Sequence, residues 1–165
     1  SLISLIKDFD NLIVIRSLTK LFSIAGLRLG YMVGNKKLLH KLKEKRDPWP
    51  LNAFAIEAGI TLLKNKKEYE TWIKKIHSWV KTEKNWMSLE IERIKELRVL
   101  NSSTNFFLIK SKNSMKPNIE YLENQGILIR ECSSFRSLSN KWARISIQTH
   151  SQNKKIINAI HNSLK

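Results

Sequence analysis

The sequence predicts an α/β protein in which a strand-and-helix region, one long helix and a compact α+β region follow one another along the chain. Short apolar runs rich in β-branched residues lie near both ends, as is typical of buried strands. Between them, apolar residues recur every three or four positions, which is the spacing of one face of a helix. Hydrophobic residues make up 42% of the 165 residues, which is enough for a packed core.

The first region carries two apolar runs and two helical patterns. Pro48 and Pro50 separate the helical patterns, because proline lacks an amide donor and restricts the residue before it. Asn52 then stands where a helix N-cap is expected, since its side chain can accept a hydrogen bond from the first turn. We therefore expect strands over 11–15 and 29–33 and helices over 36–46 and 53–64.

A long amphipathic helix is predicted over residues 67–96. Its apolar stripe consists of Trp72, Ile76, Trp79, Val80, Trp86, Met87, Ile91 and Ile94. The tryptophans could indicate a ligand-binding box, but a stripe at helical spacing is far more often packed against a core. We interpret the stripe as the core-facing side of the helix.

The last region again alternates between strand and helix patterns. Gly126 stands in the position that ends a helix, and Ser151 in the position that caps the last one. We expect strands over 99–100, 105–110, 127–130 and 142–148, and helices over 117–124 and 151–164.

These elements divide the chain into a first part over 1–65, a connecting helix over 66–96 and a small α+β domain over 97–165. A buried strand that begins at residue 11 needs neighbouring strands on both sides. One short partner strand does not provide them. We therefore expect the chain to be the C-terminal part of a longer protein.

The composition is strongly basic, with 30 Lys and Arg against 14 Asp and Glu and a formal net charge of +16. Such a charge can indicate a nucleic-acid or anionic membrane surface. Here the lysines are scattered, so we expect neither partner. No apolar run approaches the ~20 residues that cross a bilayer, and we expect a soluble, cytoplasmic protein. The single Cys and the widely spaced His residues predict no disulfide framework and no metal site.

Ser17, Lys20 and Arg28 are the candidate catalytic and binding residues of the first region. A lysine at the mouth of a buried strand can lose its proton when it is desolvated, and it can then form a Schiff base with an aldehyde. A hydroxyl and a guanidinium nearby can bind a phosphate. Gly26 and Gly30 bracket Arg28 and would allow a close approach of the backbone. The alternative is a surface loop with ordinary basic residues.

The string R-S-L-T-K that ends at Lys20, followed after five residues by G-L-R-L-G-Y around Arg28, resembles the pyridoxal-phosphate lysine region of the class I/II aminotransferases, which have fold type I. The resemblance implies the C-terminal portion of that fold: the end of the large-domain sheet, the long connecting helix and the small α+β domain. It also implies that pyridoxal 5'-phosphate is the cofactor, that Lys20 binds it covalently, and that Ser17 and Arg28 hold its phosphate.

The substrate-binding residues are also implied by resemblance. Residues 49–53, 105–106, 127–135 and 144–147 resemble the L-threonine-O-3-phosphate decarboxylase branch of this family, which is close to histidinol-phosphate aminotransferase. By this resemblance Arg144 would hold the substrate α-carboxylate and Arg130 the substrate phosphate, because paired guanidiniums suit a doubly anionic amino-acid phosphate. Trp49 and Asn52 would line the substrate pocket; for Trp49, a packing anchor is the alternative.

Some positions depart from the family pattern. Ser137 replaces a common Gly, Arg136 replaces a common Pro, and Gln148 stands where decarboxylase relatives often carry Arg. The Asp that pairs with the cofactor ring nitrogen lies upstream of the lysine in this family. Asp8 and Asp10 are too close to the first strand to be that residue.

The resemblance favours decarboxylation of L-threonine O-3-phosphate in cobalamin biosynthesis, with a homodimer as the working form. The alternative within the family is a histidinol-phosphate-type aminotransferase, in which Lys20 removes a proton from the substrate Cα. The alternatives outside enzyme function are a catalytically silent fragment and a basic nucleic-acid-binding module. We expect the 165 residues alone to be inactive and to bind the cofactor weakly.

Overall fold

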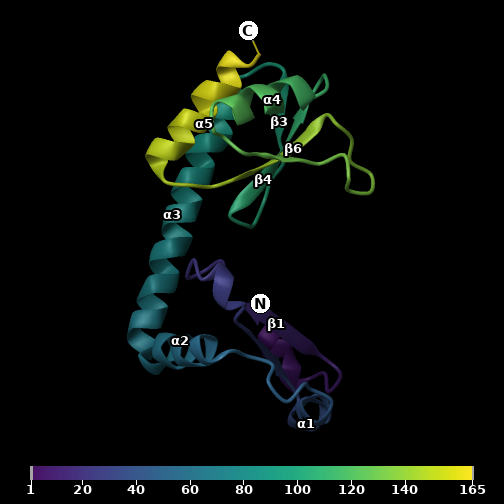
Figure 1. The fold of residues 1–165 in the computed structure, drawn as a ribbon, viewed down its shortest axis with the longest axis vertical. Helices are drawn as coiled ribbons and strands as arrows, with labels where there is room; N and C mark the ends of the chain where they lie inside the picture. The colour runs from purple at the N-terminus through teal and green to yellow at the C-terminus, as the bar shows by residue number, and fades with distance from the viewer. Residues whose placement is uncertain (1, 165) are drawn as a thin grey trace. The chain divides into compact units, whose positions relative to one another are not determined.

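The computed structural model describes residues 2–164, which form two compact units that divide within the long helix (Figure 1). The first unit ends at Ile76 and the second begins at His77. Ser1 and Lys165, the outer ends of the predicted first and last parts, lie outside the described residues. Each helix within residues 2–164 is too short or too polar to cross a membrane.

The first unit is built on a two-stranded antiparallel sheet. β1 (Ile13–Ser17) pairs with β2 (Gly30–Gly34), so that Ser17 lies opposite Gly30. The other elements of this unit are η1 (Leu2–Lys7), η2 (Ala25–Leu27), α1 (Lys36–Glu44), α2 (Ala53–Lys64) and the first turns of α3 (Lys66–Glu92).

The first strand lies two residues later than the sequence predicts. Pairing with β2 continues through Arg16 and Ser17, and this pairing sets the strand's bounds. The expected burial is not found within the described chain, where Ile15 is 76% exposed. A two-stranded sheet covers few of its own side chains, so β1 alone does not form a buried centre.

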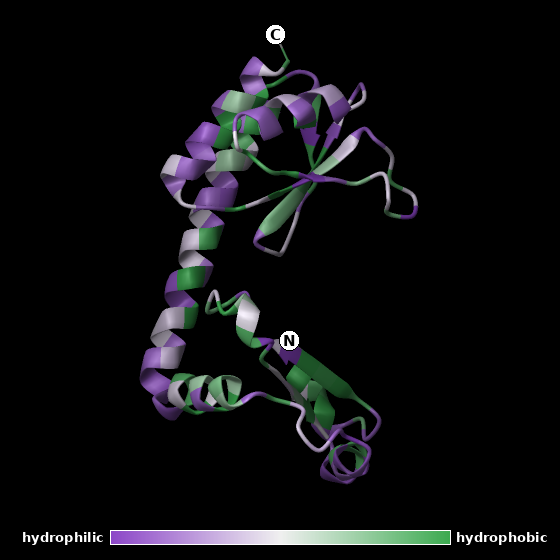
Figure 2. Cartoon of the chain, viewed as in Figure 1, coloured by the Kyte–Doolittle hydropathy of each residue, from purple (hydrophilic) through white to green (hydrophobic). Residues whose placement is uncertain are grey.

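The predicted helix over 53–64 and its N-cap are confirmed. The Oδ1 atom of Asn52 accepts a hydrogen bond from the amide of Ala55 at 2.8 Å. Figure 2 shows α2 as largely hydrophobic. Ala55 is fully buried and joins Leu18 and Leu29 in the core of this unit. The helix therefore packs onto the loop between β1 and β2.

The second unit is an antiparallel sheet with helices packed on one face. The strand order is β3-β4-β6-β5, and the elements are β3 (Leu97–Val99), β4 (Phe106–Ser111), α4 (Lys116–Asn124), β5 (Arg130–Glu131), β6 (Trp142–Ser146) and α5 (His150–Asn162). Phe107 and Ile109 of β4, with Ala143 and Ile145 of β6, form a core with buried residues of α3, α4 and α5. Because side chains alternate along a strand, Arg144 lies on the opposite face.

The core-facing interpretation of the α3 stripe is confirmed for its second half. Met87 and Ile91 are fully buried, and Val80 and Trp86 pack against the same core. Trp72 belongs to the first unit, where it has other contacts described below.

Gly126 ends α4 as predicted, with φ +71°, but other boundaries differ: α1 ends at Glu44 and α3 at Glu92, both earlier than predicted. The last helix is capped by Thr149 and not by Ser151, because Thr149 and Gln152 form a capping box. The strand predicted over 127–130 shrinks to Arg130–Glu131, since the residues before it pack on the core without pairing with β6.

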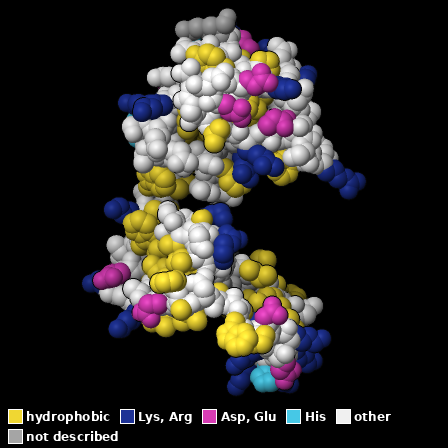
Figure 3. Space-filling model, in the orientation of Figure 1, with side chains coloured by type: hydrophobic (Ala, Val, Ile, Leu, Met, Phe, Trp, Pro, Cys, Tyr) yellow, Lys and Arg dark blue, Asp and Glu magenta, His cyan; other side chains and the backbone are white. Residues whose placement is uncertain are grey.

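Lys and Arg side chains occur in several separate groups on the face that Figure 3 shows. This distribution agrees with the scattered lysines of the sequence.

Candidate active-site residues

Three of the predicted residues lie at the end of β1 or on the loop that follows it. The loop runs from β1 to β2, and it is closed by a hydrogen bond from the Leu18 amide to the Leu29 carbonyl at 3.1 Å. Ser17 and Gly30, which flank the loop, are register partners in the sheet. The loop that carries Lys20 and Arg28 therefore begins and ends at the same edge of this strand pair.

Thr19 contacts the polar side chains of both Ser17 and Lys20. Its Oγ1 lies 2.8 Å from the hydroxyl oxygen of Ser17, and it accepts a hydrogen bond from Lys20 Nζ at 3.2 Å. Thr19 is only 4% exposed, whereas Lys20 is exposed. The structure therefore brings an ammonium and two hydroxyls together. The sequence analysis named Ser17 and Lys20 but missed Thr19, although the S-L-T-K string contains it.

Arg28 lies on the same loop in the left-handed backbone region, with φ 52°. Its Nη1 donates to the carbonyl of Ala25 at 3.3 Å, and its side chain is exposed. Gly30 lies two residues further along the chain, and a Cβ atom at this position would come within 2.8 Å of the Arg16 carbonyl oxygen. The close approach expected of Gly30 is thus to the neighbouring strand.

Arg130 and Arg144 form a second group, in the second unit. They are direct register partners on β5 and β6, so their side chains lie on the same face of the sheet. Arg144 lies over the ring of Phe106 at 4.9 Å, and Arg130 over the ring of Phe135 at 5.6 Å. Like charges directly opposite each other destabilise a sheet. A bound anion between them would relieve that repulsion.

Arg144 also has a hydrogen-bond donor without a partner. Its Nε is buried, and it forms no hydrogen bond within residues 2–164. A buried N–H without an acceptor is costly. Arg144 and Arg130 together line a cavity of about 270 Å³, which also includes Leu128, Ile129 and Ser146. The arrangement can bind a carboxylate or a phosphate through two guanidiniums.

Gln148 lines a neighbouring cavity of about 430 Å³, which shares Leu128, Ile129 and Ser146 with the arginine cavity. Gln148 is therefore close to the arginine pair. An amide there can donate and accept hydrogen bonds but brings no positive charge.

Cys132 lies behind the arginine pair as a buried thiol. It is 1% exposed, and its Sγ donates to the carbonyl of Arg130 at 3.4 Å. Burial raises the pKa of Cys132, and the positive charges of Arg144 and Arg130 oppose this shift only in part. The thiol therefore packs the strand and has little thiolate character.

Trp49 and Asn52 lie in the first unit, before α2. Trp49 is 89% exposed. The Oδ1 of Asn52 is used by the helix cap. Their predicted contact with substrate stays a prediction.

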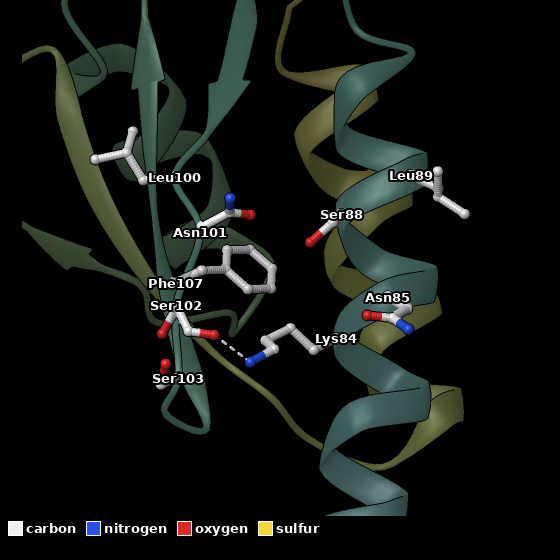
Figure 4. Close-up of a pocket in the computed structure, with 9 residues that line it drawn as sticks. All are labelled: Lys84, Asn85, Ser88, Leu89, Leu100, Asn101, Ser102, Ser103 and Phe107. Atoms are coloured by element: carbon white, nitrogen blue, oxygen red, sulfur yellow. Dashed lines mark hydrogen bonds between the residues drawn. The ribbon is translucent and has the colours of Figure 1, made fainter.

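A further polar pocket lies between α3 and the connection from β3 to β4, as Figure 4 shows. It has a volume of about 550 Å³ and includes Asn85, Ser88, Asn101 and Lys84. The ammonium of Lys84 donates to the carbonyl of Ser102. None of the residues named in the sequence analysis as catalytic or binding lines this pocket.

The chain belongs to the class I and II aminotransferases, whose family model matches residues 1–160. Pyridoxal phosphate is the cofactor of this family. The predicted fold class, a C-terminal portion of fold type I, is confirmed by the solved structures that the chain matches.

The similar proteins include both enzyme types named by the sequence analysis. The histidinol-phosphate aminotransferase of Clostridium novyi is 34% identical over 97% of this chain and 43% of its own length. The histidinol-phosphate aminotransferase of Clostridium acetobutylicum has a TM-score of 0.88, with 31% identity over 98% of this chain and 48% of its own. The L-threonine-O-3-phosphate decarboxylase of Porphyromonas gingivalis has a TM-score of 0.85, with 31% identity over 98% and 49%. The chain thus spans about half the length of the proteins it matches.

Proposed function

We propose that the chain is the C-terminal part of a pyridoxal-phosphate enzyme that decarboxylates a phosphorylated amino acid, L-threonine O-3-phosphate. The observation that carries the substrate class is the arginine pair, in which Arg130 and Arg144 face the same cavity and Arg144 Nε has no acceptor in the described part of the chain. A substrate with two anionic groups supplies acceptors for both guanidiniums.

The loop after β1 fits the cofactor. A phosphate needs hydrogen-bond donors and positive charge, and the Ser17 and Thr19 hydroxyls and the Arg28 guanidinium lie on this one loop. An aldehyde needs a primary amine, which Lys20 supplies beside Thr19. When bound, pyridoxal phosphate withdraws electrons from the substrate Cα, so that a bond to that carbon can break.

The chain's own residues would then decide which bond breaks. Arg144 would bind the α-carboxylate, and the position of its guanidinium over the Phe106 ring restrains that side chain. Arg130 would bind the substrate phosphate. If the two arginines orient the carboxylate bond for cleavage, carbon dioxide leaves.

A histidinol-phosphate-type aminotransferase is the second candidate. The similarity to Clostridium histidinol-phosphate aminotransferases favours it, as does the neutral Gln148 beside the arginine cavity, where the family resemblance implies an arginine in the decarboxylase branch. In that reaction Lys20 Nζ would move the proton from the substrate Cα. Trp49 and Asn52 would contact substrate in either case.

Several broader features belong to the same proposal. We infer three parts, over 1–65, 66–96 and 97–165, and a cytoplasmic homodimer, from the family resemblance. The 165 residues alone would lack catalytic activity, because the partner of the cofactor ring nitrogen is expected upstream of Lys20. The nucleic-acid alternative predicts binding that weakens steeply with salt, which a gel-shift series measures.

The two candidate reactions are distinguished by their products. The longer protein that contains this chain, loaded with pyridoxal phosphate, is incubated with L-threonine O-3-phosphate, and separately with histidinol phosphate and 2-oxoglutarate. Release of carbon dioxide and an aminopropanol phosphate supports the decarboxylase. Glutamate formation supports the aminotransferase, and no product from either mixture contradicts both.

The arginine pair is tested in the same protein by Arg144→Lys. We expect kcat/KM to fall about 10- to 100-fold, since a lysine keeps the charge but loses the paired donors. The matched control is Arg98→Lys on β3, an exposed position outside the arginine cavity, which should leave kcat/KM unchanged. Equal values for Arg144→Lys and the unmodified protein would contradict the assignment.

A further inference from the structure

The lysine loop is held from outside by two aromatic residues of α3. The Trp72 Nε1–H donates to the carbonyl oxygen of Leu21, the residue after Lys20, at 3.0 Å. The Trp72 ring stacks on Phe22, with centroids 6.4 Å apart and planes 14° apart. These contacts join residues 51 positions apart in the sequence.

Tyr69 completes this aromatic contact one turn earlier on α3. Its ring centroid lies 5.9 Å from that of Phe22. Burial raises the pKa of Tyr69, and the neighbouring Tyr31 of β2 raises it further; the charge of Arg16 acts in the opposite direction. Tyr69 therefore connects the ring of Phe22 to β2 within the same unit.

The loop needs such support, because its backbone is not a regular element. The amide of Phe22 bonds to the Leu18 carbonyl at 3.1 Å, and that of Ile24 to the Thr19 carbonyl at 2.9 Å. Between them Ser23 adopts φ 56°, a left-handed conformation that residues other than glycine seldom adopt and that surrounding contacts must hold. The internal bonds fix carbonyls before Lys20, and Trp72 fixes the carbonyl directly after it.

We propose that Trp72 and Tyr69 are positioning residues for Lys20, which clamp Leu21 and Phe22 against α3 and so hold the lysine beside Thr19. This inference rests on the proposed role of Lys20 in binding pyridoxal phosphate. It adds that the beginning of the connecting helix controls the lysine's reactivity. A free loop would let Nζ move away from the Thr19 hydroxyl that it now contacts at 3.2 Å.

The variant Trp72→Phe tests the clamp in the 165-residue chain. It keeps a ring against Phe22 but removes the Nε1–H donor. The protein is incubated with increasing pyridoxal phosphate and reduced with borohydride, and the modified lysines are measured by peptide mass spectrometry. We expect the half-saturating concentration at Lys20 to rise about three- to tenfold, the effect of one lost hydrogen bond. Exposed Lys37 on α1 should not change.

Hydrogen exchange gives a second measurement that does not depend on the cofactor. The amides of Phe22 and Ile24 should exchange at least about threefold faster in Trp72→Phe, because local opening becomes easier. The control is Trp79→Phe, on the same helix and 37% exposed against 38% for Trp72. It should change neither measurement.

The outcomes separate this inference from the proposed function. If the unmodified chain shows no preference for Lys20 over exposed lysines, the cofactor role of Lys20 fails, and the exchange experiment still decides whether the clamp exists. Unchanged Lys20 modification and unchanged exchange in Trp72→Phe, at equal folded fraction by circular dichroism, would overturn the clamp. Should Trp72→Phe not fold, Tyr69→Leu decides instead: it removes the ring that contacts Phe22, and the clamp requires faster exchange at Phe22.

Discussion

At the scale of single residues, Cys132 shows how burial lowers the reactivity of a thiol. It is the only cysteine in the sequence, and it lies under Arg130 with 1% of its surface exposed. Desolvation raises its pKa above the ordinary value of 9.0. The folded protein therefore keeps the thiol protonated at pH values where an unfolded chain begins to lose the proton.

Modification of this thiol should therefore be slow. At pH 8 we expect iodoacetamide to react with Cys132 at least about tenfold more slowly in the folded protein than in urea, because the thiolate is the nucleophile. The stabilising effect of the protonated thiol is complete below pH 9.0 and is lost as the pH rises through its higher folded-state pKa. Equal rates in the folded and unfolded protein would contradict this account.

A second prediction at this scale concerns the steric effect of adding a side chain at Gly30. A Cβ there would meet the Arg16 carbonyl oxygen at 2.8 Å, so Gly30→Ala forces the paired strands apart. We expect a loss of about 1–3 kcal/mol in the free energy of unfolding, measured by urea denaturation. Gly26→Ala is the matched control, since nothing lies within 4 Å of a Cβ at Gly26. An equal effect at both glycines would refute the steric explanation.

At the scale of elements, a buried polar group connects α3 to α5. Asn153 is fully buried, and its Nδ2 donates to Glu83 Oε2 at 2.9 Å and to the Gln148 carbonyl at 2.7 Å. Its Oδ1 accepts from the Gln148 amide at 2.9 Å. His150, whose ring is tilted by 58° against that of Trp86, contacts the same Glu83 oxygen at 3.1 Å. One asparagine thus provides partners for a buried carboxylate and for the turn that precedes α5.

Asn153→Ala should therefore destabilise the second unit strongly. It removes the Asn153 amide from the buried Glu83 carboxylate, which keeps only its contact with His150, and it removes both bonds to the Gln148 backbone, so we expect the free energy of unfolding to fall by about 2–4 kcal/mol. Asn158→Ala, on the exposed side of the same helix, should change it by less than about 0.5 kcal/mol. Urea denaturation of both variants is the measurement, and similar losses would exclude the network as the cause.

Element positions were predictable where the signal is local. The long helix, the N-cap at Asn52 and the end of α4 at Gly126 follow from spacing and from the chemistry of single residues. Strand bounds were predicted less well: β1 is shifted by two residues and β5 is short. A strand extends as far as its partner pairs with it, and the partner is distant in sequence.

At the scale of the whole molecule, family membership and the charge of +16 suggest different functions. The family indicates an enzyme, whereas such a charge can indicate nucleic-acid binding. The chain belongs to an enzyme family, and its basic residues are spread over several groups on the face that Figure 3 shows. Excess positive charge also attracts anionic small molecules to a site by long-range steering. The charge is therefore compatible with an amino-acid phosphate as substrate and needs no nucleic acid to explain it.

From the sequence, the residues of the candidate site could be predicted only as separate short segments, without the contacts between them. Ser17, Lys20 and Arg28 are close in sequence, so one motif contains them all, and the family resemblance follows from it. Thr19 was missed because a hydroxyl inside a motif is not distinguished from its neighbours until burial and hydrogen bonds are known. Trp72 was assigned to a core-facing stripe, and the spacing could not show that its indole N–H reaches the lysine loop.

The amino-acid order by itself determined the family, the motif around Lys20 that resembles it and most helices, because these depend on residues that are neighbours along the chain. Only the tertiary structure decided that Arg130 lies opposite Arg144, that Arg144 Nε has no acceptor among residues 2–164 and that Trp72 donates a hydrogen bond to Leu21. Strand register and contacts between distant helices and loops depend on how the whole unit packs, and no local pattern records them.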